Sequence, residues 1–218
     1  MDIVLLGPPG VGKGTQANRL RRKLGCPHIA SGDLFRKIRR GNTPLARQVR
    51  EHMDRGEYVP DQLTIELVLK RLAEPDAQRG FLLDGFPRTL PQATALDAAL
   101  DEQNRNVDAA LYITAPTQVL INRVAGRIIC PQCGTIYNSV TKPPRQDLVC
   151  DNDGHALERR TDEDPEVVRA RLEIYKRQTK PLAEYYDKKG VLHEIDGSLP
   201  MEQVNANIDL ALKAEVAS

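Results

Sequence analysis

Short, unbroken runs of apolar residues recur along the chain, and each ends at a glycine, an acid or a polar turn. Runs of this length without an internal polar position are typical of strands that a parallel sheet buries on both faces. The unbroken runs predict strands over Ile3–Leu6 and Phe81–Asp84, and further strand candidates are Pro27–Ala30, Val107–Thr114 and Val191–Ile195.

Segments with helical periodicity lie between these runs. Ala17, Leu20 and Leu24 recur at the spacing of one helix face, and 63–72 is another helix-like stretch. Ser31 stands where a side chain caps the start of a helix. Because strands and helices alternate, we expect an α/β fold with a parallel sheet flanked by helices.

The segment 130–160 interrupts this alternation and is interpreted as a small inserted lobe. It is rich in Pro, Gly, Asn, Asp and Thr, and it holds three of the four cysteines at zinc-knuckle spacing: Cys130, Cys133 and Cys150. Asp153 completes a second pair with Cys150, and zinc accepts carboxylate oxygen as well as thiolate. His155 is the alternative fourth ligand, and iron is an alternative metal. So small a lobe buries little apolar surface, so a structural Zn²⁺ would stabilise it.

Composition changes the picture mainly by exclusion. Across 218 residues, 31 basic side chains nearly cancel 30 acidic ones, which leaves a net charge of +1. We therefore expect no broad basic surface for nucleic acid or an anionic membrane. The apolar runs are too short to cross a bilayer, and the N-terminus has no basic leader, so the expected location is cytoplasmic.

The stretch "GPPGVGKGT", 7–15, directly follows the first predicted strand and opens a predicted helix. This context is typical of a phosphate-binding loop, in which glycines allow backbone amides to surround phosphate oxygens at a helix N-terminus. Lys13 would reach the β- and γ-phosphates. Gly14 separates Lys13 from Thr15, whereas the hydroxyl residue more often follows the lysine directly.

A second motif, "FLLDGFPRTLPQ", 81–92, follows a buried strand. Asp84 ends that strand, where a carboxylate can hold Mg²⁺ directly or through water. Arg88 can bind phosphate in a bidentate manner, and Gln92 offers a donor and an acceptor for the edge of a base. Further arginines could gather around a transferred phosphoryl group if the fold brings them together: Arg36, Arg123, Arg127, Arg160 and Arg171.

These motifs, together with "SGDLFR", "NRVAGRI" and "RRTDEDPEVVRARL", resemble the adenylate kinase family in order and spacing, and in particular its long-lid bacterial form. The likeness runs from Met1 to about Ile208, and the "GKGT" variant of the loop belongs to it. It implies a P-loop NTPase-type parallel five-stranded sheet flanked by helices, with an AMP-binding lobe and an inserted lid. It also implies reversible transfer of the γ-phosphoryl group of MgATP to AMP, giving two ADP, with lobe closure that excludes water.

The resemblance also implies residue roles. ATP contacts are implied for Gly10, Val11, Gly12, Lys13, Gly14, Thr15, Arg123, Arg127, Thr135 and Tyr137. AMP contacts are implied for Ser31, Arg36, Val59, Gly85, Arg88, Gln92, Arg160 and Arg171. The groups expected around the transferred phosphoryl group are Lys13, Arg88, Arg123, Arg127, Arg160 and Arg171, with Asp84 orienting hydrated Mg²⁺ and Asp162 as a further acid.

The likeness divides the chain into a core of 1–30, 61–126 and 165–218, a nucleoside-monophosphate lobe of 31–60, and a lid with zinc knuckles of 127–164. It implies a monomer whose partners are ATP, AMP and ADP. Three other hypotheses remain at this point. The chain could be a UMP or CMP kinase, a zinc-ribbon nucleic-acid binder, or a nucleotide-driven switch with slow hydrolysis.

Overall fold

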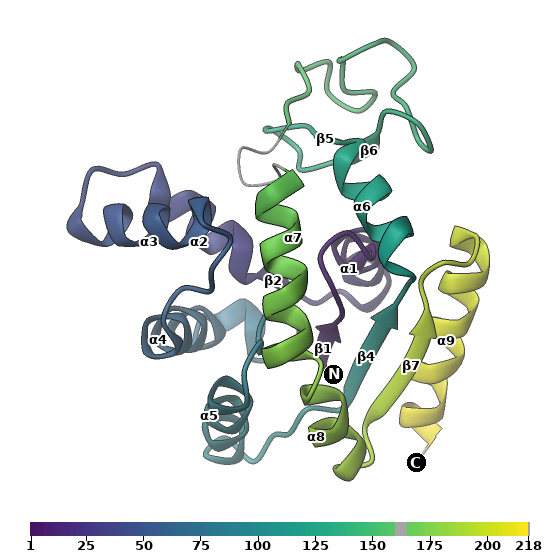
Figure 1. Ribbon diagram of the computed structural model, residues 1–218. Coiled ribbons are helices and arrows are strands. Elements are labelled where there is room, and N and C mark those ends of the chain that lie inside the picture. The colour runs from purple at the N-terminus through teal and green to yellow at the C-terminus, as the bar shows by residue number, and fades with distance from the viewer. Residues whose placement is uncertain (160–164, 218) are drawn as a thin grey trace.

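The computed structural model describes residues 1–159 and 165–217, and a parallel five-stranded sheet runs through its centre (Figure 1). The strand order is β2-β3-β1-β4-β7. The strands are β1 (Asp2–Leu6), β2 (His28–Ala30), β3 (Phe81–Asp84), β4 (Ala109–Thr114) and β7 (Leu192–Asp196). The expected α/β fold and its five predicted strands are thus confirmed.

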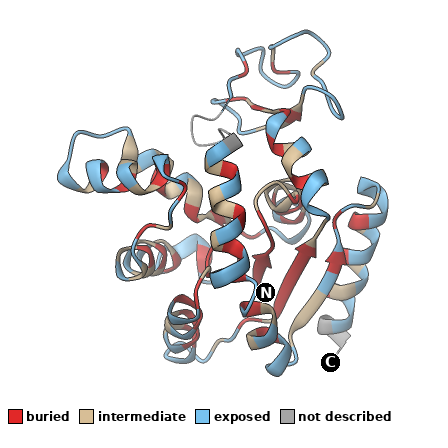
Figure 2. Ribbon diagram, viewed as in Figure 1, coloured by how far each residue is buried: buried red, intermediate tan, exposed pale blue. Residues whose placement is uncertain are grey.

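Alternate residues of β1 pack into two hydrophobic cores, one on each face of the sheet. Ile3 and Leu5 pack into one core and Val4 and Leu6 into the other, and all four side chains are almost fully buried. The first core is completed by α1 (Lys13–Leu24), α6 (Thr117–Ala125), α7 (Pro165–Ile174) and α9 (Met201–Ala217). The second is completed by α4 (Asp61–Leu72), α5 (Leu90–Asp101) and α8 (Leu182–Lys188). Burial on both faces explains why the central strands β1 and β4 are almost wholly apolar, and Figure 2 shows both mainly in red. The edge strand β7 is less buried and carries His193 and Glu194.

Two lobes extend from this three-layer body and have small cores of their own. The first is made of α2 (Ser31–Arg39) and α3 (Pro44–Asp54), with a core that includes Phe35 and Val49. The second holds an antiparallel pair, β5 (Arg127–Ile129) and β6 (Ile136–Asn138). It lies beyond the end toward which β4 points, whereas α2 and α3 project to one side (Figure 1). Both lobes therefore flank the carboxyl edge of the sheet, where α/β proteins bind ligands.

One predicted helix start is wrong, and two irregular turns lie between the regular helices and strands. The predicted cap role of Ser31 is wrong, because α2 begins at Ser31 itself and the Ser31 hydroxyl donates to the Gly85 carbonyl at 2.6 Å. After α7 the chain forms a π-helical turn, η2 (Tyr175–Thr179), before Pro181 and α8. A short 3₁₀ turn, η1 (Pro75–Ala77), precedes β3. Among the described residues, no helix combines the length and hydropathy needed to span a membrane.

Candidate functional site

The loop 7–12 joins β1 to α1 and lies at the carboxyl edge of the sheet. Gly7 has φ +144°, and a Cβ there would lie 2.3 Å from the Ile113 carbonyl oxygen, so only glycine lets the loop pass this close to β4. Gly12 precedes α1 with φ 106° and provides no side-chain cap. The first amides of α1 are therefore left for an anionic ligand.

Lys13 lies folded back over this loop. Its Nζ donates to the carbonyl oxygens of Gly7 at 2.8 Å and Pro8 at 3.0 Å. Burial, reinforced by the charge of Arg88 and other arginines, lowers the pKa of Lys13 to about 8, although Asp84 opposes the shift. The ammonium group is thus poorly solvated and lies near other cations. A bound anionic phosphate would stabilise its charged form.

Asp84 ends β3 beside β1, and the two strands pair in parallel. Burial alone would raise the pKa of Asp84, but His28 and the charge of Lys13 outweigh burial and hold that pKa below its ordinary value. The Nε2 atom of His28, on β2, lies 3.5 Å from Asp84 Oδ2. Asp84 therefore stays ionised, as a carboxylate that holds a hydrated cation must.

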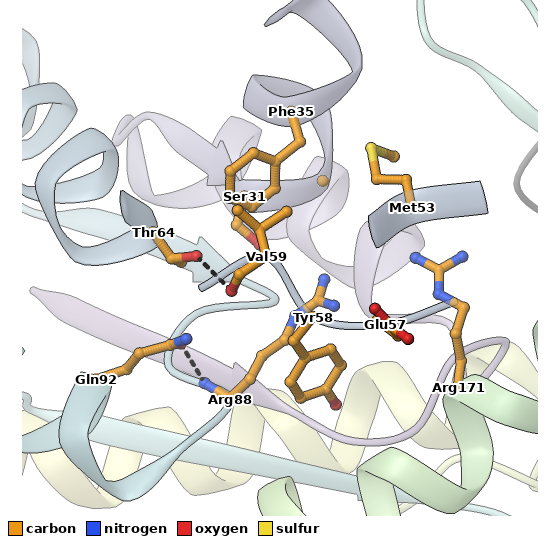
Figure 3. A pocket seen from close by; sticks show the side chains of 11 residues that line it. Ser31, Phe35, Met53, Glu57, Tyr58, Val59, Thr64, Arg88, Gln92 and Arg171 are labelled. Carbon is orange, nitrogen blue, oxygen red and sulfur yellow. Dashed lines mark hydrogen bonds between the residues drawn. The ribbon is translucent and has the colours of Figure 1, made fainter. Parts of the chain in front are cut away.

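A pocket opens between the α2–α3 lobe and the sheet (Figure 3). Phe35, Met53 and Val59 supply apolar walls, and Gln92 and Arg88 supply polar groups. Apolar walls with a few convergent polar groups are typical of a site for a small organic ligand. The pocket is therefore suited to a planar base joined to an anionic group.

One peptide carbonyl aligns two side chains of this pocket. The Gly85 oxygen accepts from Ser31 Oγ at 2.6 Å and from Arg88 Nε at 2.7 Å. Gly85 has φ +75°, and a Cβ there would lie 2.9 Å from both the Ser31 hydroxyl and the Arg88 guanidinium. Burial lowers the pKa of Arg88, but a guanidinium stays charged in proteins. The pocket thus contains a fixed cation.

A larger cleft extends from this pocket past the phosphate-binding loop to the β5–β6 lobe. Arg88 and Arg171 line both the pocket and the cleft, and Arg36 and Arg127 line the cleft. Arg123, also in the cleft, donates to the Gly197 carbonyl at 2.8 Å. Five of the predicted arginines thus line one cleft, while Arg160 and Asp162 lie outside the described residues.

Thr135 and Tyr137 lie in the β5–β6 lobe, close to its cysteines. Tyr137 lines the cleft and is buried, with its hydroxyl 3.6 Å from Cys150 Sγ. Thr135 Oγ1 is 3.1 Å from Cys133 Sγ. Both residues therefore pack against the cysteine cluster, and Tyr137 also faces the cleft.

The four predicted metal ligands are brought together. One ligand atom from each of four residues lies within 4.8 Å of the others: Cys130, Cys133, Cys150 and Asp153. The Cys133 and Cys150 sulfurs are 3.6 Å apart, and Cys130 Sγ is 3.3 Å from Asp153 Oδ2. A tetrahedral zinc ion about 2.3 Å from its thiolates holds two sulfurs roughly 3.8 Å apart. The donor set and its spacing fit such an ion.

His155 lies outside this cluster and supports Asp153. Its backbone amide donates to Asp153 Oδ1 at 3.1 Å, and its exposed ring lies 3.4 Å from the same oxygen. The amide is the main reason that the pKa of Asp153 lies well below its ordinary value. The geometry thus favours Asp153 over His155 as the fourth ligand.

Several residues at the site were not singled out from the sequence. His28 contacts Asp84, and Tyr58 and Glu57 line the pocket beside Arg88. Their positions depend on contacts between residues far apart in the chain, and nothing in their local spacing indicates a site.

Comparisons with known proteins agree with this geometry. Residues 5–191 match a family model described as "Adenylate kinase". A curated protein named "Adenylate kinase" from Staphylococcus epidermidis (strain ATCC 35984) is 47% identical over 208 residues, which cover 95% of this chain and 97% of that protein. A protein of the same name from Staphylococcus aureus (strain Mu50) matches with the same identity and coverage.

Proposed function

Because the chain belongs to the adenylate kinase family, we propose how its residues divide the transfer of the γ-phosphoryl group of MgATP to AMP. The observation that carries the proposal is the pair Arg88 and Arg171, which line both the pocket and the cleft. Where two anionic nucleotides meet, shared guanidinium groups neutralise both and stabilise the charge that develops on the transferred group.

The cleft is proposed to bind ATP. The amides of Gly10 to Thr15 would surround the phosphates, with Lys13 released from its carbonyl partners to reach the β- and γ-oxygens. Arg123, Arg127, Thr135 and Tyr137 would line the nucleotide on its lobe side. Asp84 would orient the hydrated Mg²⁺ that arrives with ATP, and a bound Mg²⁺ bridges and neutralises the phosphate oxygens.

The pocket is proposed to bind AMP. Val59 would pack against the base, and Gln92 would hydrogen-bond its edge. The phosphate would be held by Arg36, Arg88 and Arg171. Ser31 and Gly85 would keep the pocket wall and Arg88 in position. Arg160 and Asp162 keep the roles that the family likeness implies, beside the transferred group.

Cys130, Cys133, Cys150 and Asp153 are proposed to hold a structural Zn²⁺ in the lid of 127–164. The described core of this lobe contains only five buried residues, of which two are cysteines: Ile128, Cys130, Tyr137, Cys150 and Leu157. So small a core gives little stability without a metal. A closed four-ligand site has no open position for catalysis, so this ion would be structural.

Lobe closure over both nucleotides is proposed to exclude water, which would otherwise accept the phosphoryl group. The lobe of 31–60 and the lid would move against the core of 1–30, 61–126 and 165–218. One chain lines both nucleotide sites, which supports a monomeric enzyme. The free cysteines of the described chain support a reducing compartment such as the cytoplasm.

A coupled assay of MgATP with AMP, UMP and CMP tests this assignment. AMP should be the best acceptor, and ATP should be lost only slowly without an acceptor. Lys13→Ala should lower kcat by about 10²- to 10³-fold, as removal of one electrostatic stabiliser does. Faster turnover of UMP or CMP, or a near-normal rate for Lys13→Ala, would contradict the proposal.

A further inference from the structure

Gln92 sits at the inner end of the acceptor pocket, in the first turn of α5. Its side chain is only 1% exposed and lines the pocket. Its backbone amide donates to Thr89 Oγ1, which caps the helix. Gln92 therefore has little freedom to move, and only the direction of its amide group decides what it offers to a ligand.

Two fixed neighbours decide that direction. Gln92 Oε1 accepts from the backbone amide of Arg88 at 2.8 Å, the contact marked in Figure 3, and Gln92 Nε2 donates to Asp61 Oδ1 at 2.7 Å. A backbone N–H can only donate and a carboxylate can only accept. A reversed amide would set two donors against each other at one end and two acceptors at the other. The observed direction is thus the only one that satisfies both neighbours.

Asp61 is itself held in place from behind the pocket wall. It is the first residue of α4, and its second oxygen accepts from Thr89 Oγ1 at 2.9 Å. Asp61 does not line the pocket, whereas Gln92 and Arg88 do. Any influence of Asp61 on a ligand therefore acts through Gln92.

After these contacts the Gln92 amide keeps one N–H and one oxygen lone pair for a base. Adenine offers an amino donor at C6 next to an acceptor at N1. A 6-oxopurine offers the reverse, an oxygen acceptor at C6 next to an N1–H donor. For a base held in one pose, the two purines require opposite amide directions, and a site with mismatched buried polar groups rejects the wrong ligand strongly.

We propose that Asp61 is a positioning residue for base selection: it holds the Gln92 amide in the direction that pairs with a 6-aminopurine and rejects a 6-oxopurine. This inference rests on the proposed assignment of the pocket to AMP. Asp61 contacts no substrate, and its carboxylate acts only by fixing the direction of the Gln92 amide.

The test compares AMP with inosine monophosphate as acceptors in the MgATP-coupled assay. Asp61→Asn keeps the shape of the side chain but offers an amide that can also donate, so residue 61 no longer opposes the reversed direction of the Gln92 amide and only the Arg88 amide still does. The ratio of kcat/KM for AMP to that for inosine monophosphate should fall by about tenfold or more. The change should appear chiefly in KM, and the KM of MgATP should stay within about twofold.

Asp97→Asn is a matched control. Asp97 is a buried acid of α5 that is bonded to Tyr185 and Lys189 and does not line the pocket. Its loss should lower the melting temperature and leave the acceptor ratio unchanged. Asp61→Ser, which also removes the carboxylate, provides a second variant in case Asp61→Asn does not fold.

The outcomes separate the inference from the function on which it rests. A wild-type enzyme that uses AMP, with an unchanged acceptor ratio in folded Asp61→Asn or Asp61→Ser, would show that Asp61 is only a structural link between α4 and α5 and would overturn the inference. A wild-type enzyme that does not use AMP would overturn the pocket assignment itself. A lowered ratio of kcat/KM for AMP to that for inosine monophosphate in either Asp61 variant, with the ratio unchanged in Asp97→Asn, supports the positioning role of Asp61.

Discussion

The guanidinium carbon of Arg88 lies 4.9 Å from the centre of the Tyr58 ring, and the two side chains stack within the acceptor pocket. The Tyr58 hydroxyl is 2.8 Å from Thr179 Oγ1, and Thr179 in turn donates to the Arg88 carbonyl oxygen at 2.9 Å. Tyr58 thus ties the segment between α3 and α4 to both Arg88 and the π-helical turn η2.

Tyr58 variants separate the stacking contact from the hydroxyl contact. Tyr58→Phe keeps the ring and should leave the KM of AMP within about twofold, since a partly exposed hydrogen bond contributes about 1 kcal/mol or less. Tyr58→Leu removes the cation–π contact, which contributes about 0.5–2 kcal/mol, so the KM of AMP should rise roughly three- to tenfold. Steady-state kinetics with each substrate varied in turn checks this. A larger effect of Tyr58→Phe than of Tyr58→Leu would contradict the role of the ring.

Arg88→Ala should impair AMP more than ATP. The side chain is half-buried, and its loss removes a fixed cation from the pocket proposed for AMP. We therefore expect the KM of AMP to rise at least about tenfold together with a lower kcat. Calorimetry should find the affinity for MgATP reduced far less. Arg71→Ala is the control: it removes a surface ion pair between Arg71 on α4 and Asp76 in η1 and should change neither parameter. An equal loss of affinity for AMP and for MgATP would contradict the assignment of Arg88 to the AMP pocket.

The lowered pKa of Lys13 predicts proton uptake when MgATP binds. The pKa of Lys13 is about 8 in the folded chain and 10.5 in its ordinary state, so at pH 8.5 the free enzyme holds Lys13 mostly uncharged. Phosphate binding would restore its charge and take up close to one proton. Calorimetry at pH 8.5 in buffers of different ionisation enthalpy measures this uptake, and Lys13→Met should abolish it.

The same shift has a consequence for stability. Below pH 8 the folded state carries a buried, charged Lys13, which costs stability; between about pH 8 and 10.5 the unfolded chain binds more protons than the folded one. Lys13 therefore contributes more stability as pH rises through this window. Wild type should therefore be less stable than Lys13→Met at pH 8, and this difference in unfolding free energy should narrow or reverse as the pH rises from about 8 to 10.5. Urea titrations at several pH values measure it. A gap that stays constant with pH would refute the shift.

If Cys130, Cys133, Cys150 and Asp153 hold the proposed Zn²⁺, its removal should destabilise the protein without removing a catalytic group. Chelation, or Cys133→Ala, should lower the melting temperature by about 5 °C or more, because each kcal/mol corresponds to about 2–4 °C in a chain of this size. Cys26→Ala, at a buried cysteine outside the cluster, should keep the full metal content. Native protein with less than about half an equivalent of zinc would exclude the structural site.

The sequence predicted those parts of the fold that depend on local pattern. The strand Phe81–Asp84 is apolar up to its last residue because both of its faces are buried there. The loop 7–15 combines its glycines with a preceding strand and a following helix. The metal cluster followed from the spacing of its donors. In each case the information lies within a short stretch of chain.

Features that depend on distant contacts could not be predicted in this way. The Ser31 hydroxyl was assigned to a helix cap, but it meets Gly85, which lies 54 residues away in the chain. Tyr58 contacts Thr179, 121 residues away, and Asp61 contacts Gln92, 31 residues away. Such pairs arise from the packing of α2, α4 and α5 against the sheet edge, and no local periodicity indicates them.

The Gly85 peptide carries a constraint beyond the geometry of one turn. Since its carbonyl oxygen aligns both Ser31 and Arg88, and any Cβ would press on both, a single codon change there misaligns the acceptor wall from two sides at once. A second mutation at either neighbour would repair only half of the damage. Replacement of Gly85 is therefore expected to be selected against, because no single change at a neighbouring residue would relieve both contacts.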